Sequence, residues 1–122
     1  MKKIILPLLL VFIIALGGCN SSLQIGAVEK STKHEFSSSY YKLNGTKEKR
    51  ITVKEGNPLK VSMEVVTNKG SIDVTISMDK DNVDYEGHDI PTTSSAITLS
   101  KPGNYTIKVN AKDHKGGYQF KW

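Results

Sequence analysis

Cysteine is almost absent from this chain of 122 residues, since Cys19 is the only one. A single cysteine excludes an intramolecular disulfide and a thiolate metal cluster. Histidine is scarce too, and His34, His88 and His114 stand tens of residues apart. We therefore expect each histidine to be an exposed loop residue, with a shared zinc or catalytic site as the alternative.

Signals for a helix, for a nucleophile and for nucleic-acid binding are also missing after residue 19. No stretch repeats its apolar residues every 3.6 positions for long enough to form a helix. The serines at 37–39 and 94–95 lack the glycine frame of a nucleophile elbow, which argues against a hydrolase. Basic and aromatic residues are not interleaved, so we expect no nucleic-acid partner. The sequence favours a non-enzymatic protein without a cofactor.

The first nineteen residues carry the pattern of an export signal. Lys2 and Lys3 precede the apolar run 4–16, as in a secretory signal peptide. Thirteen helical residues span only about 20 Å, against the roughly 30 Å of hydrocarbon that a transmembrane helix must cross. The ending Leu16-Gly17-Gly18-Cys19 resembles the lipobox of bacterial lipoproteins.

That resemblance implies a signal peptide over residues 1–18 and a lipid on Cys19. In the family, the cysteine thiol receives a diacylglycerol and a lipoprotein signal peptidase cuts just before it. Two acyl chains are enough for stable attachment, whereas one chain holds only marginally. We expect a protein anchored to the outer face of the cell membrane, with an ordinary cleaved signal as the alternative. Replacing Cys19 with Ala should release the protein or leave it unprocessed.

The mature chain is predicted to have two parts. Residues 19–33 are rich in Ser, Gly, Gln, Thr and Lys, a composition typical of a flexible tether. Residues 34–122 are predicted to form one small folded domain. Apolar and polar residues alternate clearly at 59–65, 72–78, 105–111 and 118–122, and more weakly at 36–43, 50–54, 83–85 and 96–99.

Period-two alternation places each apolar set on one face of a strand. Turn residues separate the segments, and Asn44-Gly45 is typical of a tight hairpin. Further turns are predicted at 56–58, 68–70, 80–82, 102–104 and 116–117. The pattern favours an all-β domain, an antiparallel two-sheet β-sandwich of jelly-roll type with seven or eight strands.

The alternation also predicts the core and the position of the last strand. Trp122 would be unusual on a frayed tail, so the strand that it ends should be docked. The nineteen predicted inward residues are Ile51, Val53, Leu59, Val61, Met63, Val65, Ile72, Val74, Ile76, Met78, Ile97, Leu99, Tyr105, Ile107, Val109, Ala111, Tyr118, Phe120 and Trp122.

Two stretches of the domain carry a recognisable pattern, Gly-Ser-Ile-Asp-Val-Thr-Ile at 70–76 and Lys-Pro-Gly-Asn-Tyr-Thr-Ile-Lys-Val at 101–109. They resemble bacterial pre-peptidase C-terminal domains and related jelly-roll modules. In that family an aspartate-bearing strand precedes a Pro-Gly-x-Tyr strand and a final aromatic strand. The resemblance covers about residues 36–122 and implies an accessory binding role, although no peptidase domain accompanies it here.

Charge is distributed unevenly along the domain. Residues 44–70 carry six Lys or Arg against three Glu, and residues 101–122 carry five Lys against one Asp. Between them, residues 71–90 carry one Lys against six acids. The alternatives are solvated strand faces and basic strands that face an anionic surface, such as lipid headgroups or phosphate-rich wall polymers.

Two weak candidate sites follow from residue type. Asp79, Asp81, Asp84 and Glu86, with Asp89 nearby, offer the oxygen ligands that Ca²⁺ needs, but without the spacing of a calcium loop; a solvated acidic hairpin is the alternative. Tyr40, Tyr41 and Tyr85 are candidates for stacking on a sugar, and one of the paired Tyr40 and Tyr41 should be exposed. The alternative is ordinary sheet packing.

The sequence therefore predicts a lipid-anchored cell-surface β-sandwich that acts as a binding module for a wall polymer, a glycan or a protein. An exposed aromatic or basic patch on one sheet would favour this function. The alternatives are a structural or stress-related envelope lipoprotein without a dedicated ligand and, third, a small hydrolase, which would need a pocket that joins a histidine, an acid and a nucleophile.

Overall fold

The computed structural model describes residues 22–122, and every element in this range is a β-strand. The predicted lipobox residues Leu16, Gly17, Gly18 and Cys19 lie outside the described residues. Residues 22–122 contain no helix of the length and apolarity that a membrane span requires. The strands are β1 (Ser22–Ile25), β2 (Val28–Ser31), β3 (Glu35–Val53), β4 (Leu59–Ser77), β5 (Val83–Gly87), β6 (Thr93–Leu99) and β7 (Gly103–Lys121).

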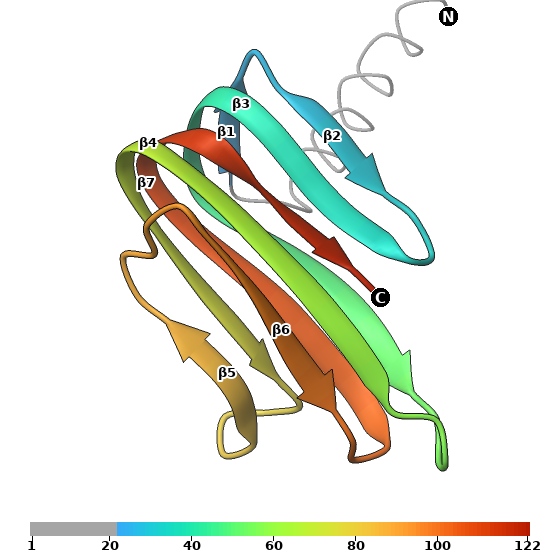
Figure 1. Cartoon of the computed structure of the whole chain (residues 1–122). Helices are drawn as coiled ribbons and strands as arrows, with labels where there is room; N and C mark the ends of the chain where they lie inside the picture. The colour runs from blue at the N-terminus through green and yellow to red at the C-terminus, as the bar shows by residue number, and fades with distance from the viewer. Residues whose placement is uncertain (1–21) are drawn as a thin grey trace, which may run out of the picture.

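All pairings are antiparallel, and three strands of 19 residues run through both layers of the sandwich. An extended strand of this length would span roughly 60 Å. Figure 1 shows instead that β3, β4 and β7 fold over at one end of the molecule, which we call the bend. The order of the sheet is β1-β3-β7-β4-β5, with β2 also on β3 and β6 also on β4.

The bend divides the sheet into two layers that face each other. Layer A contains β2, residues 35–40 of β3, 116–121 of β7, 59–67 of β4, and β6. Layer B contains residues 45–53 of β3, 103–111 of β7, 71–77 of β4, and β5. The predicted two-layer, antiparallel, all-β architecture is confirmed, but the layers are halves of one continuous folded sheet.

Register shifts make the bend. They lie between Tyr40 and Gly45 in β3, between Thr67 and Ser71 in β4, and next to Asp113 in β7. An extra residue at such a bulge lets the strand turn while it keeps its apolar side chains inward. The inward positions change parity there, from Tyr40 to Leu43 in β3, for example.

Three predicted turns are therefore wrong. Asn44-Gly45, residues 68–70 and Gly116-Gly117 lie inside β3, β4 and β7 at the bend. Gly45, Gly70 and Gly116 have φ values of 113°, 77° and 137°. The positive φ that suits a hairpin turn also suits a bulge, so these residues bend a strand without ending it.

The core lies between the layers and matches the predicted list closely. Fifteen of the nineteen predicted residues are buried, and Leu59, Met78, Ile97 and Trp122 pack against them while partly exposed. The prediction missed Phe36, Tyr40, Leu43 and Ile90, which complete the cluster.

Two strands lie within the predicted tether, so the folded domain begins before residue 34. β1 pairs with residues 42–45 of β3, and β2 pairs with residues 36–39. Every residue of β2 is exposed, so its composition resembles that of a linker. Backbone hydrogen bonds to an edge strand hold this segment, and they leave no apolar signature in the sequence.

Side chains also connect β2 to layer B. Lys47 is almost buried, and its Nζ lies 3.1 Å from a carboxylate oxygen of Glu29. Lys49 donates a hydrogen bond of 3.0 Å to the hydroxyl of Ser31. A lysine at this depth needs a partner for its charge, so Glu29 compensates Lys47 where the sandwich would otherwise be open.

The predicted docking of the last strand is confirmed. Residues 116–121 of β7 lie between β3 and β4 and pair with both. The backbone N–H of Trp122 donates to the carbonyl of His34 at 3.1 Å.

Candidate functional site

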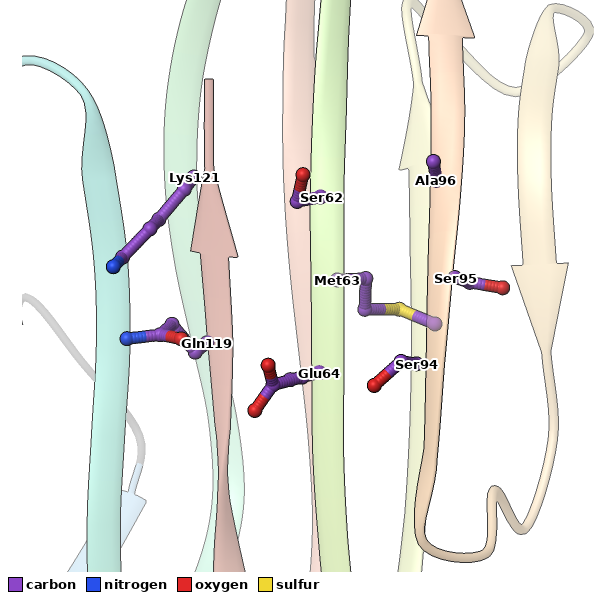
Figure 2. Close-up of a pocket in the computed structure, with 8 residues that line it drawn as sticks. All are labelled: Ser62, Met63, Glu64, Ser94, Ser95, Ala96, Gln119 and Lys121. Atoms are coloured by element: carbon purple, nitrogen blue, oxygen red, sulfur yellow. The ribbon is translucent and has the colours of Figure 1, made fainter.

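The outer face of layer A is hollowed by two adjoining shallow grooves. One of about 520 Å³ lies between β6, β4 and β7, and Figure 2 shows its polar side chains, including Glu64 and Gln119. The other, of about 790 Å³, shares Glu64 and Gln119 and continues across β3 to Val28 and Tyr41. We call the two together the layer A groove.

Strand register arranges the groove in rows. Ser37, Gln119 and Glu64 lie side by side on β3, β7 and β4. In the next row Ser39, Gly117 and Val66 are neighbours in the same way. Because Gly117 has no side chain, the centre of the groove is bare backbone. A Cβ on Gly117 would crowd the carbonyl of Ser38, so close packing of β3 on β7 requires glycine here.

Among the residues that the structure describes, most of the large exposed apolar side chains lie at one end of the groove. Tyr41 is 63% exposed, and Val28 and Val66 are also open to solvent on the lining. Ile25 is exposed next to Gly26, which belongs to the same lining. Of the large exposed apolar residues among 25–122, only Val83 lies elsewhere. Exposed apolar side chains that cluster in one place are typical of binding surfaces.

Tyr41 is held at this end by a cation. The Nζ of Lys115 lies 4.7 Å from the centre of the Tyr41 ring. A lysine over an aromatic face is attracted by the negative charge of the ring face, which restrains both side chains. Tyr41 therefore presents a positioned aromatic ring beside a positive charge.

Glu35 is the most connected polar group of the groove. Its carboxylate accepts hydrogen bonds from the Ser37 hydroxyl at 3.1 Å and the Gln119 amide at 3.2 Å. Partial desolvation raises its pKa, but these hydrogen bonds and nearby Lys30 and Lys121 outweigh that effect, so its pKa lies below the usual value. Glu35 is therefore ionised at neutral pH and fixes the Gln119 amide in the groove.

The structure does not bring the three candidate tyrosines together. Tyr41 points outward and Tyr40 inward, as the alternation predicts. Tyr40 is buried at the bend, and Tyr85 packs against the core from β5 in layer B. Of the three, Tyr41 and Tyr40 touch the groove, and only Tyr41 presents an exposed ring.

The acidic segment forms turns and ion pairs. The Asp79 carboxylate accepts hydrogen bonds from the backbone of Asp81 and Asn82 and from the Asn82 amide. The hydrogen bonds that Asp79 accepts from Asn82 and Asp81 lower its pKa. Glu86 lies on β5 and pairs with His88 at 2.8 Å. Over residues 22–122, no three acids, histidines or cysteines come close enough to surround a metal ion.

His114 corrects the prediction that every histidine is exposed. It is fully buried on β7 at the bend. Its Nδ1 lies 2.6 Å from the Tyr40 hydroxyl, and its Nε2 lies 2.9 Å from the Thr67 hydroxyl. Thr67 donates its hydroxyl hydrogen to the Ile90 carbonyl at 2.8 Å. Thr67 must then accept from Nε2–H, so Tyr40 donates to an unprotonated Nδ1.

This chain of hydrogen bonds connects β3, β7, β4 and the loop before β6. Burial lowers the pKa of His114 and raises that of Tyr40, so both groups stay neutral. Each polar hydrogen of the chain has an acceptor, which makes it a structural connection at the bend.

Tyr40→Phe is expected to destabilise the domain by about 1–3 kcal/mol, because it leaves the buried Nδ1 of His114 without a donor. Tyr41→Phe is the matched control, since it removes a hydroxyl from the adjacent, exposed tyrosine. Its free energy of unfolding should stay within about 0.5 kcal/mol of wild type. Urea unfolding followed by the fluorescence of Trp122, the only tryptophan, measures both. Equal stabilities of the two variants would contradict the hydrogen-bond chain.

Acid is expected to weaken the fold through His114. Its folded pKa lies below its ordinary value of 6.5. As the pH falls below 6.5, His114 binds a proton in the unfolded protein more readily than in the folded protein. Its contribution to the free energy of unfolding is therefore complete above pH 6.5 and is lost as the pH falls from there. His88 has the opposite sign, because the hydrogen bonds that its ring donates to the carboxylates of Glu86 and Asp73 raise its pKa. Urea unfolding of His88→Gln between neutral pH and the carboxylate range isolates His114, and a flat profile would refute this assignment.

The fold defines an all-β, two-layer protein, and comparisons with known proteins find likeness in fold. No family model matches the sequence. No curated protein matches it either. A similar solved structure is the pre-peptidase C-terminal domain of collagenase from Bacillus anthracis, with 16% identity, a TM-score of 0.47 and coverage of 84% of this chain and 87% of that one.

A second similar structure is the carbohydrate-binding module TmCBM61, solved in complex with β-1,4-galactotriose. It shares 16% identity and a TM-score of 0.40, with 81% of this chain and 63% of that one covered.

Proposed function

We propose that this chain is a lipid-anchored, non-catalytic binding module at the outer face of the cell membrane, and that its layer A groove binds a glycan of the cell envelope. The anchor is the lipid on Cys19 that the lipobox resemblance implies. The observation that carries the binding role is Tyr41, exposed and positioned by Lys115 at the end of a polar groove.

The chemistry of the groove suits a sugar. A pyranose offers hydroxyl groups around its edge and an apolar face of C–H groups. The groove offers hydrogen-bonding partners for the sugar hydroxyl groups: the hydroxyls of Ser37 and Ser39, the amide of Gln119 and the carboxylate of Glu64. Tyr41 provides a flat apolar ring with a polar tip for the C–H face of the sugar.

The charge of the groove narrows the ligand class. Glu29, Glu35 and Glu64 balance the charges of Lys30, Lys115 and Lys121 in its lining, so the groove has no net positive charge to attract a polyphosphate. A neutral glycan needs no such charge. Neither groove lining contains a histidine, so the described residues do not join a histidine, an acid and a nucleophile there, as the hydrolase alternative requires.

Tyr41→Ala is expected to weaken binding to purified cell-wall glycan at least about fivefold, because loss of aromatic contact in a binding site costs about 1–3 kcal/mol. The matched control is Lys108→Ala, an exposed residue on the outer face of layer B. Co-sedimentation with insoluble wall glycan, completed by titration with soluble fragments, gives the affinities. Unchanged binding by Tyr41→Ala, or equal loss in both variants, would contradict the groove assignment.

A further inference from the structure

Exposed lysines gather at the bend. Lys69 of β4 lies opposite Lys115 of β7, and Lys112 lies opposite Ser71. All three lysines are exposed, and within residues 22–122 none has a carboxylate at ion-pair distance, whereas Lys42 beside them pairs with Asp113 at 3.4 Å. We call Lys69, Lys112 and Lys115 the bend lysines. Like charges held this close produce a positive local potential.

The chain enters the domain at the same place. β1 begins at Ser22, which lies opposite Gly45, and Gly45 lies opposite Ala111, the neighbour of Lys112. Only three peptide steps separate Cys19 from Ser22, and peptide geometry limits them to about 11 Å. A lipid on Cys19 therefore keeps the bend within roughly one headgroup layer of the bilayer surface.

We propose that the bend lysines dock on the anionic headgroups of the membrane that holds the anchor. This inference rests on the proposed lipidation of Cys19. Two independent features converge on one surface: the short covalent reach from the anchor, and three exposed lysines beside a single carboxylate, that of Asp113, which already pairs with Lys42. Each lysine near an anionic leaflet favours contact by on the order of fivefold.

Docking on this surface orients the rest of the molecule. The hairpins β3–β4, β4–β5 and β6–β7 lie at the end opposite the bend and point away from the membrane (Figure 1). Asp73 and Asp89 lie near the bend, on the β4–β5 edge of layer B, so an anionic surface favours the orientation in which this edge tilts away from it. The layer A groove then runs outward from the headgroups: its Tyr41 end lies next to the membrane, and its end at Glu64 and Gln119 is open to a glycan.

Fluorescence quenching in vesicles tests the orientation. The full chain, purified with its lipid, is reconstituted in vesicles of phosphatidylcholine and phosphatidylglycerol that carry a headgroup-linked quencher. A fluorophore is attached at Asn68→Cys, at the bend, or at Asn57→Cys, in the β3–β4 turn. We expect several-fold stronger quenching at position 68, and equal quenching at both positions would overturn the docking.

Charge variants identify the cause. Lys69→Gln with Lys112→Gln should reduce the quenching at position 68 severalfold, as should salt at about 0.5 M, which screens charges beyond a few ångströms. Lys54→Gln with Lys101→Gln removes the same charge from the opposite end and should change nothing. Equal loss in both pairs would overturn the role of the bend lysines. Failure of the protein to float with the vesicles, with an unacylated Cys19 in the mass spectrum, would refute the anchor itself, which is distinct from an anchored but unoriented protein.

Discussion

Deletion of residues 117–122 is expected to abolish cooperative folding. The segment is the centre of layer A, where it pairs with β3 on one side and β4 on the other. It also carries Tyr118 and Phe120, both buried in the core. Loss of two buried aromatic side chains costs about 3–5 kcal/mol each, as much as the whole stability of many small domains.

Removal of Trp122 alone is the control for this deletion. Trp122 is partly exposed, so its loss should lower the melting temperature and leave one cooperative transition. Far-UV circular dichroism during heating, together with the dispersion of amide NMR signals, distinguishes the two results. A sharp transition in the chain that lacks 117–122 would show that layer A does not depend on β7.

Gly70→Ala is expected to damage the bend severely. Gly70 has a φ of 77°, and a Cβ there would overlap the backbone carbonyl of Asp113. Positive φ alone costs an alanine about 1–2 kcal/mol. Backbone overlap cannot relax through a rotamer change, so β4 and β7 must separate, and we expect a total loss above about 3 kcal/mol.

Gly56→Ala isolates the conformational part of this loss. Gly56 has a φ of 78°, nearly the same as Gly70, but no atom lies within 4 Å of its would-be Cβ. Its replacement should cost only about 1–2 kcal/mol. The difference between the two variants in urea unfolding measures the contact of β4 with β7. Equal costs would mean that the bend is looser than described.

The sequence was sufficient for the core and the fold class because both depend on local alternation. A strand that is buried on one face has an apolar residue at every second position. All nineteen predicted inward residues belong to the core or pack on it. The continuity of β3, β4 and β7 was not predictable in this way. A bulge and a hairpin use the same residues, such as Asn44-Gly45, and only pairing with distant strands decides between them.

His114 illustrates a signal that was present but overlooked. Counting back by twos from Phe120 passes through Tyr118 and Gly116 to His114, so the parity of the last strand places its ring inside. A polar residue at an inward position needs partners, and those come from Tyr40 and Thr67, far away in the sequence. The partners explain why the position tolerates a histidine.

Of the groove's lining residues, only Tyr40 and Tyr41 were among the predicted candidates. The other lining residues, such as Ser37, Glu64 and Gln119, are ordinary outward residues of three separate strands. They become one surface through the register of β3, β7 and β4, which no local pattern specifies. Because Gly117 has no side chain, that surface is hollowed at its position. In the sequence, Gly116-Gly117 resembled a turn.

Amide chemical-shift mapping with soluble fragments of wall glycan tests the central claim most directly. The account predicts shifts that concentrate at Ser39, Tyr41 and Gly117, on the outer face of layer A, and that vanish in Tyr41→Ala. Shifts confined to layer B, or none at saturating glycan, would contradict it.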